Sequence, residues 1–222
     1  MCTNYRPTAR DIVQERFAAE LVDDAYPPEA FPGYLAPIVR RSREPLASAT
    51  APAAREALLG RFGLIPHWAR DDTIGRRTYN ARTETVAEKP SFRTAWAKAQ
   101  RCIVPMDHFF EPNWESGKAV RWRLAHAQGE PLGVAGLWAW WRAPNGAEVH
   151  SFTMLTVNAD AHPVMNHFHR PGEEKRMLVI LPPADYDAWL AAPVDTAPAF
   201  FRPCPADALV ASAAPLPPRV RR

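Results

Sequence analysis

The chain has 222 residues, of which 47% are hydrophobic and 23% charged, a balance that excludes a disordered polymer and suits one domain of generous size. No run of eighteen apolar residues is present to span a bilayer, and the polar start MCTNYRPTARD excludes an ordinary secretory signal, so we predict a cytoplasmic protein with no membrane partner. A net charge of +3 is too small to prove a nucleic-acid partner and too positive to repel one.

The first predicted helix begins at Thr8, where an acidic residue follows three positions later as in a capping box, and it ends before Tyr26. Its apolar residues recur every four positions and define a buried face: Val13, Phe17 and Leu21. A second short helix is predicted over residues 91–100, with two aromatic side chains on one face: Phe92 and Trp96.

The remaining apolar runs are short, rich in β-branched and aromatic residues, and bounded by proline or glycine, as strands are. They lie at residues 61–65, 102–104, 119–124, 132–140, 149–157 and 177–181. The clearest alternation sets one apolar face against one basic face: Val120, Trp122 and Leu124 against Arg121 and Arg123. A last helix is predicted over residues 185–190. Because helices do not alternate regularly with strands, we predict an α+β fold with a mostly antiparallel sheet.

Three cysteines, Cys2, Cys102 and Cys204, are too few for a disulfide framework and have no CxxC spacing, so free thiols are expected. Cys2 differs from the other two because removal of Met1 would leave it with both a free α-amine and a thiol. An aldehyde can form an imine with such an amine, and the thiol then closes a thiazolidine ring. The alternative is that Cys2 is an ordinary residue of a frayed terminus.

Six segments follow this cysteine in order. They read RFGLIPHW (61–68), YNARTET (79–85), RCIVPMDHFFEPNW (101–114), AGLWAWW (135–141), FTMLTVNAD (152–160) and HFHRPGEEKRMLVIL (167–181). Together with the second-position cysteine, the series resembles the SRAP family (SOS response-associated peptidase), the abasic-site shielding proteins. The resemblance covers residues 60–181 well, and also the N-terminus.

The resemblance implies a single compact domain over residues 1–222, with a barrel-like, mostly antiparallel sheet and a few short helices. It also implies a positively charged groove for single-stranded DNA, with Cys2 on its floor as the nucleophile that crosslinks an abasic site. The family's name implies a linked autopeptidase activity on the Met1–Cys2 bond. We infer no cofactor and no obligate protein partner.

Three further residues take catalytic roles by the same resemblance: Asn80, Glu111 and His169. A carboxylate held near apolar side chains, as Glu111 is, suits the proton transfers of imine formation. Asn80 can donate and accept hydrogen bonds at once, so it can orient the amine and the sugar. His169 can bond the sugar oxygen or shuttle a proton. The alternatives are a surface glutamate at a strand end and an asparagine in a turn or helix cap.

Two other histidines lie close to His169 in the sequence. His167 competes with it, and we favour His169 because Arg170 then begins the loop that separates the histidine from the strand at Met177. The three positions His162, His167 and His169 fit no zinc-site spacing and have no cysteine pair beside them, so we predict no metal.

A positive stripe for DNA is predicted around the Asn80 segment, from Arg76, Arg77, Arg82 and Arg93. Forked guanidinium groups match phosphate oxygens, and Trp68 is placed to stack on bases. The competing interpretations are a solvated loop for the first two arginines and a core position for Trp68. The tryptophans at 138, 140 and 141 are assigned to packing in the sheet.

The sequence departs from the family pattern in several places, among them the N-terminus and the loop after the histidine. The family start reads Met-Cys-Gly-Arg, whereas Thr3 and Asn4 follow Cys2 here, which removes an arginine that would face phosphate and leaves Arg6 as the nearest replacement. Residues 170–175 also lengthen the loop after the histidine. Two functions of other classes stay open: an N-terminal-cysteine peptidase or amidase acting in trans, and a non-catalytic single-strand binding module.

Overall fold

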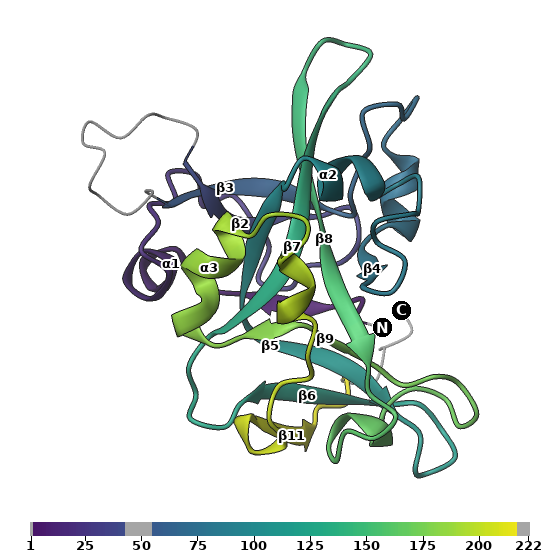
Figure 1. Ribbon diagram of the computed structural model, residues 1–222. Helices are drawn as coiled ribbons and strands as arrows, with labels where there is room; N and C mark the ends of the chain where they lie inside the picture. The colour runs from purple at the N-terminus through teal and green to yellow at the C-terminus, as the bar shows by residue number, and fades with distance from the viewer. Residues whose placement is uncertain (1, 43–54, 217–222) are drawn as a thin grey trace, which may run out of the picture.

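The fold is organised around one eleven-stranded sheet that curls until it closes (Figure 1). The computed structural model describes residues 2–42 and 55–216. The strands are β1 (Tyr5–Pro7), β2 (Leu35–Arg41), β3 (Arg55–Phe62), β4 (Asn80–Arg82), β5 (Arg101–Asn113), β6 (Val120–His126), β7 (Leu132–Arg142), β8 (Glu148–Asn158), β9 (Arg176–Leu178), β10 (Ile180–Leu181) and β11 (Leu209–Ala213). Strand β7 pairs with β5 as well as with β8, so the strands β5, β7, β8, β3 and β2 form a closed ring. Closure satisfies the backbone donors and acceptors that an open edge would expose.

Strand β5 is long and connects the ring to the rest of the sheet. Its residues 101–106 pair with β7, and its residues 108–113 pair with β6. Strand β1 pairs with the middle of β5, residues 106–109, and β11 continues the sheet beyond β6. Among the described strands, β3 and β4 run parallel to β8 and the other pairs are antiparallel. The predicted α+β class with a mostly antiparallel, barrel-like sheet is therefore confirmed.

The interior of the ring is filled by aromatic and aliphatic side chains from facing strands. Phe62 meets Tyr5 edge-on and stacks on Phe152, with 5.4 Å between ring centroids in each pair. Ile38 and Phe109 are fully buried in the same cluster. Each aromatic pair contributes about 0.5–1.5 kcal/mol beyond the area that it buries. One continuous cluster joins β1 to β11, so the described residues share a single core.

Three α-helices occur among the described residues: α1 (Arg10–Phe17), α2 (Arg93–Ala97) and α3 (Tyr186–Ala191). The helix predicted up to Tyr26 ends much earlier, because Ala18 takes a left-handed conformation with φ 51° that stops it at Phe17. Leu21 is buried all the same, through an isolated bridge to Ala57 of β3. No helix within the described ranges is long and apolar enough to cross a membrane.

Several strands differ from their predicted extents. The strand predicted at 61–65 runs from Arg55 to Phe62, and the strand predicted at 102–104 continues to Asn113. The latter passes through Pro105 and Pro112, which read in the sequence as strand boundaries. The segment predicted at 177–181 divides into β9, which pairs with β8, and β10, which pairs with β7. Four strands have no counterpart among those predicted: β1, β2, β4 and β11.

A close backbone approach requires glycine at position 63. Gly63 has φ 116°, and a Cβ there would overlap the carbonyl oxygen of Gly75. We expect Gly63→Ala to lower the free energy of unfolding by about 2–3 kcal/mol, measured by urea denaturation. Gly33→Ala is the matched control, because Gly33 also has a positive φ, 96°, but meets nothing within 4 Å; its expected cost is about 1 kcal/mol. Equal losses in the two variants would contradict the contact.

Candidate functional site

Cys2 is held against β5 at the start of the chain. The carbonyl oxygen of Asn4 accepts the backbone N–H of Phe110 at 3.0 Å, and it also accepts the Cys2 thiol, 3.5 Å from Sγ. The Cys2 side chain is only 1% exposed. Burial raises the pKa of the thiol, and the nearby Glu111 carboxyl raises it further. The thiol is therefore uncharged at neutral pH and lies close to a buried acid.

Glu111 stands in the second half of β5 and is 3% exposed. Burial raises the pKa of its carboxyl, because the charged form loses hydration, and His169 partly opposes this rise. A carboxyl whose pKa moves towards neutrality can both release and take up a proton at working pH. Glu111 therefore has the character of an acid/base group.

His169 faces Glu111 from the loop before β9. Its Nδ1 lies 3.5 Å from Oε2 of Glu111, and its Nε2–H donates to the carbonyl oxygen of Arg176 at 3.0 Å. Its backbone N–H donates to the carbonyl oxygen of Pro112 at 3.0 Å, and its φ is 65°. A left-handed histidine costs free energy that surrounding contacts must offset, and such residues cluster at functional sites. The structure therefore brings Cys2, Glu111 and His169 together.

The other two histidines lie elsewhere. His167 is exposed and pairs with Glu115, with 2.6 Å between Nδ1 and Oε1. His162 is buried, and its Nδ1 accepts the backbone N–H of Met165 while Nε2 lies 3.0 Å from the carbonyl oxygen of Cys204. Across the described ranges, no three or more His, Cys, Asp or Glu side chains group closely enough to hold a metal ion.

Asn80 stands at the start of β4, directly after Tyr79. Its Nδ2 donates to the carbonyl oxygen of Tyr79 at 3.0 Å, and its Oδ1 is buried with no hydrogen-bond donor among the residues that the structure describes. Burial raises the pKa of the Tyr79 phenol, and Glu111 and Cys2 raise it further, so this phenol lies close to both groups. Tyr79 did not figure in the sequence prediction, and only its place before Asn80 points to it.

The predicted basic residues are divided between open and paired positions. Arg76 and Arg77 are exposed at the end of a 3-10 turn, Thr73–Arg77, and Arg93 is exposed at the start of α2. Arg82 is also exposed, but its Nη1 lies 2.7 Å from Oε2 of Glu174. The charge of Arg82, which the sequence assigned to DNA binding, is thus already neutralised by Glu174.

Trp68 does not belong to the core. Its side chain is 49% exposed, and its indole N–H donates to the carbonyl oxygen of Pro90 at 3.4 Å. The bond holds the half-exposed ring at the surface.

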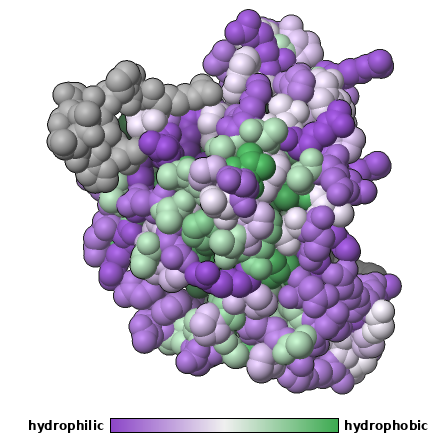
Figure 2. Space-filling view, in the orientation of Figure 1, coloured by the Kyte–Doolittle hydropathy of each residue, from purple (hydrophilic) through white to green (hydrophobic). Residues whose placement is uncertain are grey.

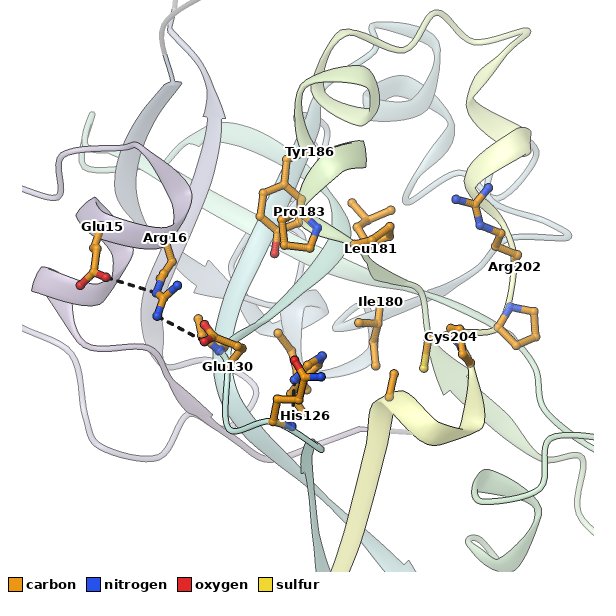
Figure 3. Close-up of a pocket in the computed structure, with 17 residues that line it drawn as sticks. Glu15, Arg16, His126, Glu130, Ile180, Leu181, Pro183, Tyr186, Arg202 and Cys204 are labelled. Carbon is orange, nitrogen blue, oxygen red and sulfur yellow. Dashed lines mark hydrogen bonds and ion pairs between the residues drawn. The ribbon is translucent and has the colours of Figure 1, made fainter.

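A cavity of about 750 Å³ lies away from all these residues, between α1, β10 and α3 (Figure 3). Its wall includes Ile180, Leu181 and Tyr186, and an ion pair of 3.2 Å joins Arg16 to Glu130 at its rim. Figure 2 shows apolar side chains gathered in the middle of this face of the molecule. None of the predicted site residues lines the cavity.

The family model described as SOS response associated peptidase (SRAP) matches residues 1–220 of the chain. The chain belongs to the SRAP family. A crystal structure of a protein from Bordetella bronchiseptica is 42% identical with a TM-score of 0.87, and the match covers 97% of this chain and 100% of that one. A second, from Bacteroides thetaiotaomicron, shares the fold at 23% identity and a TM-score of 0.75, over 96% of this chain and 91% of that one.

Two curated relatives of this SRAP chain carry functional names. The abasic site processing protein YoqW of Bacillus subtilis is 34% identical over 143 residues, which are 64% of this chain and 60% of YoqW. The abasic site processing protein HMCES of Xenopus tropicalis is 29% identical over 130 residues, 49% of this chain and 38% of HMCES. The chain therefore spans less than two thirds of the length of these relatives.

Asn4, at the position where the sequence departs from the family pattern, contacts a residue of β6. Arg121 donates from Nη2 to Oδ1 of Asn4 at 2.7 Å and to Oε2 of Glu29 at 2.9 Å, and its guanidinium lies 3.2 Å from the ring centroid of Phe110. The predicted alternation in β6 places Arg121 correctly opposite Trp122. No local pattern signals that the N-terminal segment covers it. Asn4 thereby anchors the chain two residues after Cys2.

Lys175 holds the lengthened loop of this SRAP chain in place. Its Nζ donates to the carbonyl oxygens of His169 at 3.1 Å and Arg170 at 2.8 Å. We expect Lys175→Met to lower the free energy of unfolding by about 1 kcal/mol and to speed hydrogen exchange at the His169 amide, because the left-handed turn loses two charged hydrogen bonds. Lys118→Met, on an exposed turn, is the control. An unchanged exchange rate at His169 would contradict this role.

Proposed function

We propose that this SRAP chain binds single-stranded DNA and crosslinks abasic sites through a mature N-terminal Cys2, shielding the lesion during the cytoplasmic SOS response to DNA damage. The observation that carries the proposal is the buried pair of Glu111 and His169, 3.5 Å apart, beside the Cys2 thiol. The names of YoqW and HMCES, both abasic site processing proteins, support the choice of substrate.

The crosslink forms in two bond-making steps. The α-amine of Cys2, once Met1 is removed, adds to the aldehyde carbon of the ring-opened sugar, and one water leaves to give an imine. The thiol sulfur then bonds to the same carbon while its proton passes to the nitrogen, which closes the thiazolidine ring. Glu111 in its acid form protonates the departing hydroxyl, and as a carboxylate it takes the thiol proton. This second transfer is needed because burial keeps the thiol protonated.

The neighbouring residues orient these steps. His169 presents Nδ1 to Glu111 and can pass a proton between that carboxyl and the sugar oxygen. The Oδ1 of Asn80, which has no donor within the described part of the chain, suits the amine or a sugar hydroxyl. Arg76 and Arg77 are open for phosphates and Trp68 for a base, whereas Arg82 must first leave Glu174.

The same acid/base group suits an autopeptidase step. Water would add to the carbonyl carbon of Met1, the bond to the Cys2 nitrogen would break, and free methionine would leave. Met1 lies outside the described residues. Intact mass of freshly expressed Glu111→Gln protein tests the step: retained methionine supports it, and complete removal assigns the cleavage to another enzyme.

The proposal is tested with a single-stranded oligonucleotide that carries one abasic site. Protein shown by intact mass to lack Met1 is incubated with it and boiled in denaturant, and the products are separated on a denaturing gel. The expected product is a shifted band whose mass is the sum of protein and DNA less one water. No shifted band from protein that begins at Cys2 would overturn the proposal. A second assay uses small peptide amides that carry a fluorophore. If the protein releases the fluorophore and forms no crosslink with DNA, a peptidase acting in trans is favoured instead.

A further inference from the structure

The loop that carries Trp68 is hydrogen-bonded to the segment that leads to Asn80. The backbone N–H of Leu64 donates to the carbonyl oxygen of Thr78 at 3.3 Å, and the Thr78 hydroxyl donates to the carbonyl oxygen of Leu64 at 2.7 Å. A DNA strand held beside Asn80, as the proposed function requires, would therefore pass close to this loop. The protein surface beyond the loop therefore decides where the flanking nucleotides of the DNA lie.

Two adjoining hollows extend from the Trp68 loop over α2 and the outer part of β7. The nearer hollow is lined by His67 and Ser91, and the farther one, of about 390 Å³, by Arg41 and Arg101. Both are lined by Lys98 and by Trp140, whose indole is 41% exposed between them. No aspartate or glutamate is among the described residues that line either hollow. We call this region the Trp140 surface.

Arg101 supplies an independent observation beneath the farther hollow. The residue is 2% exposed, and none of its three guanidinium nitrogens has a hydrogen-bond partner among the described residues. The guanidinium lies 3.9 Å from the ring centroid of Trp96, and burial lowers the pKa of Arg101 to about 10. A buried charge without an acid is costly, and an anion brought into the hollow above it would offset part of that cost.

We propose that the Trp140 surface binds the single strand of DNA that flanks the reacting nucleotide, with a base on Trp140 and phosphates at Lys98 and Arg41. Exposed tryptophan between cations, without acids, is the pattern that sequence-independent single-strand binding uses. The uncompensated charge of Arg101 adds to the attraction for phosphate from below. The choice of DNA as ligand rests on the proposed function, whereas the chemistry of the surface does not.

The test uses undamaged strands, so that it is independent of the crosslink. Fluorescence anisotropy would measure the Kd of oligothymidines at several salt concentrations. Their lengths lie below and above the roughly 4–16 nucleotides that a single-strand binding domain covers. For the longer strand, we expect Trp140→Ala to weaken binding about 5- to 20-fold and Trp140→Phe to retain most of it, because a phenyl ring still stacks. The double variant Arg41→Gln/Lys98→Gln should lower the salt slope of log K by about 1.4, two phosphate contacts at about 0.7 each.

Lys118→Gln, which removes a cation from the exposed turn before β6, is the charge control and should leave the slope unchanged. Wild-type values of Kd and slope for both surface variants, each shown by its Tm to be folded, would overturn the proposal. Equal displacement of the strand by polyglutamate, with no effect of Trp140→Ala, would assign the surface to acidic peptides and also overturn it. If wild type binds as expected but forms no crosslink with abasic DNA, the proposed function fails while the Trp140 surface stands.

Discussion

Replacement of Cys2 by alanine is expected to abolish the covalent product with abasic DNA while leaving salt-sensitive binding intact. Alanine keeps the α-amine, so an imine can still form, but it has no sulfur to close the ring, and an imine is lost by hydrolysis when the sample is boiled. The measurement is the shifted band on the denaturing gel, with anisotropy as the record of reversible binding. A boiling-resistant band of full intensity from Cys2→Ala would refute the thiazolidine.

Two further variants make this result specific. Cys2→Ser retains the amine beside a weaker nucleophile, so its product should be trapped only when borohydride reduces the imine to an amine. Cys204→Ala is the matched control, because Cys204 is also a buried thiol and burial raises its pKa to about 12. Cys204 lines the cavity beside α3, which Cys2 does not line, and its removal should leave the crosslink at the wild-type level.

Glu111→Gln is expected to slow crosslinking about 10²- to 10⁴-fold, the range that loss of a general acid/base covers. Glutamine has nearly the shape of glutamate and can still bond His169, so geometry is kept while proton transfer is lost. Single-turnover rates on the abasic oligonucleotide measure the effect. Glu88→Gln, at an exposed position, is the control, and a Glu111→Gln rate within twofold of it would remove Glu111 from the chemistry.

The same substitution should stabilise the fold at neutral pH. Because burial raises the pKa of Glu111 above its unfolded value, its contribution to stability is fully present below the unfolded pKa and is lost as pH rises through the folded pKa. Glutamine carries no charge at any pH, so Glu111→Gln should gain about 1 kcal/mol at pH 7 and nothing below pH 4, by urea denaturation. A variant that is less stable than wild type at neutral pH would contradict this, because it would mean that interactions in the fold offset the cost of burying the Glu111 carboxylate.

Much of the sheet follows from local sequence. The runs around Trp122, Trp138 and Phe152 are rich in β-branched and aromatic residues, and each forms a strand close to its predicted extent. The pattern fails where proline interrupts it, as at Pro105 and Pro112 inside β5. It also misses β4, which has three residues and forms because β8 offers it backbone partners. Pairing over a long sequence separation can override a weak local preference.

The candidate site divides in the same way. The cysteine at position 2 and the ordered motifs around Asn80, Glu111 and His169 can be recognised in the sequence, and they are enough to indicate the SRAP family. The structure shows that His169, which the sequence favoured over His167, meets Glu111. The tertiary structure alone decided that Glu174 pairs with Arg82 and that Arg121 bonds Asn4. The reason is physical: propensity acts over a few neighbouring residues, whereas burial, pKa and ion pairing depend on side chains that only folding brings together.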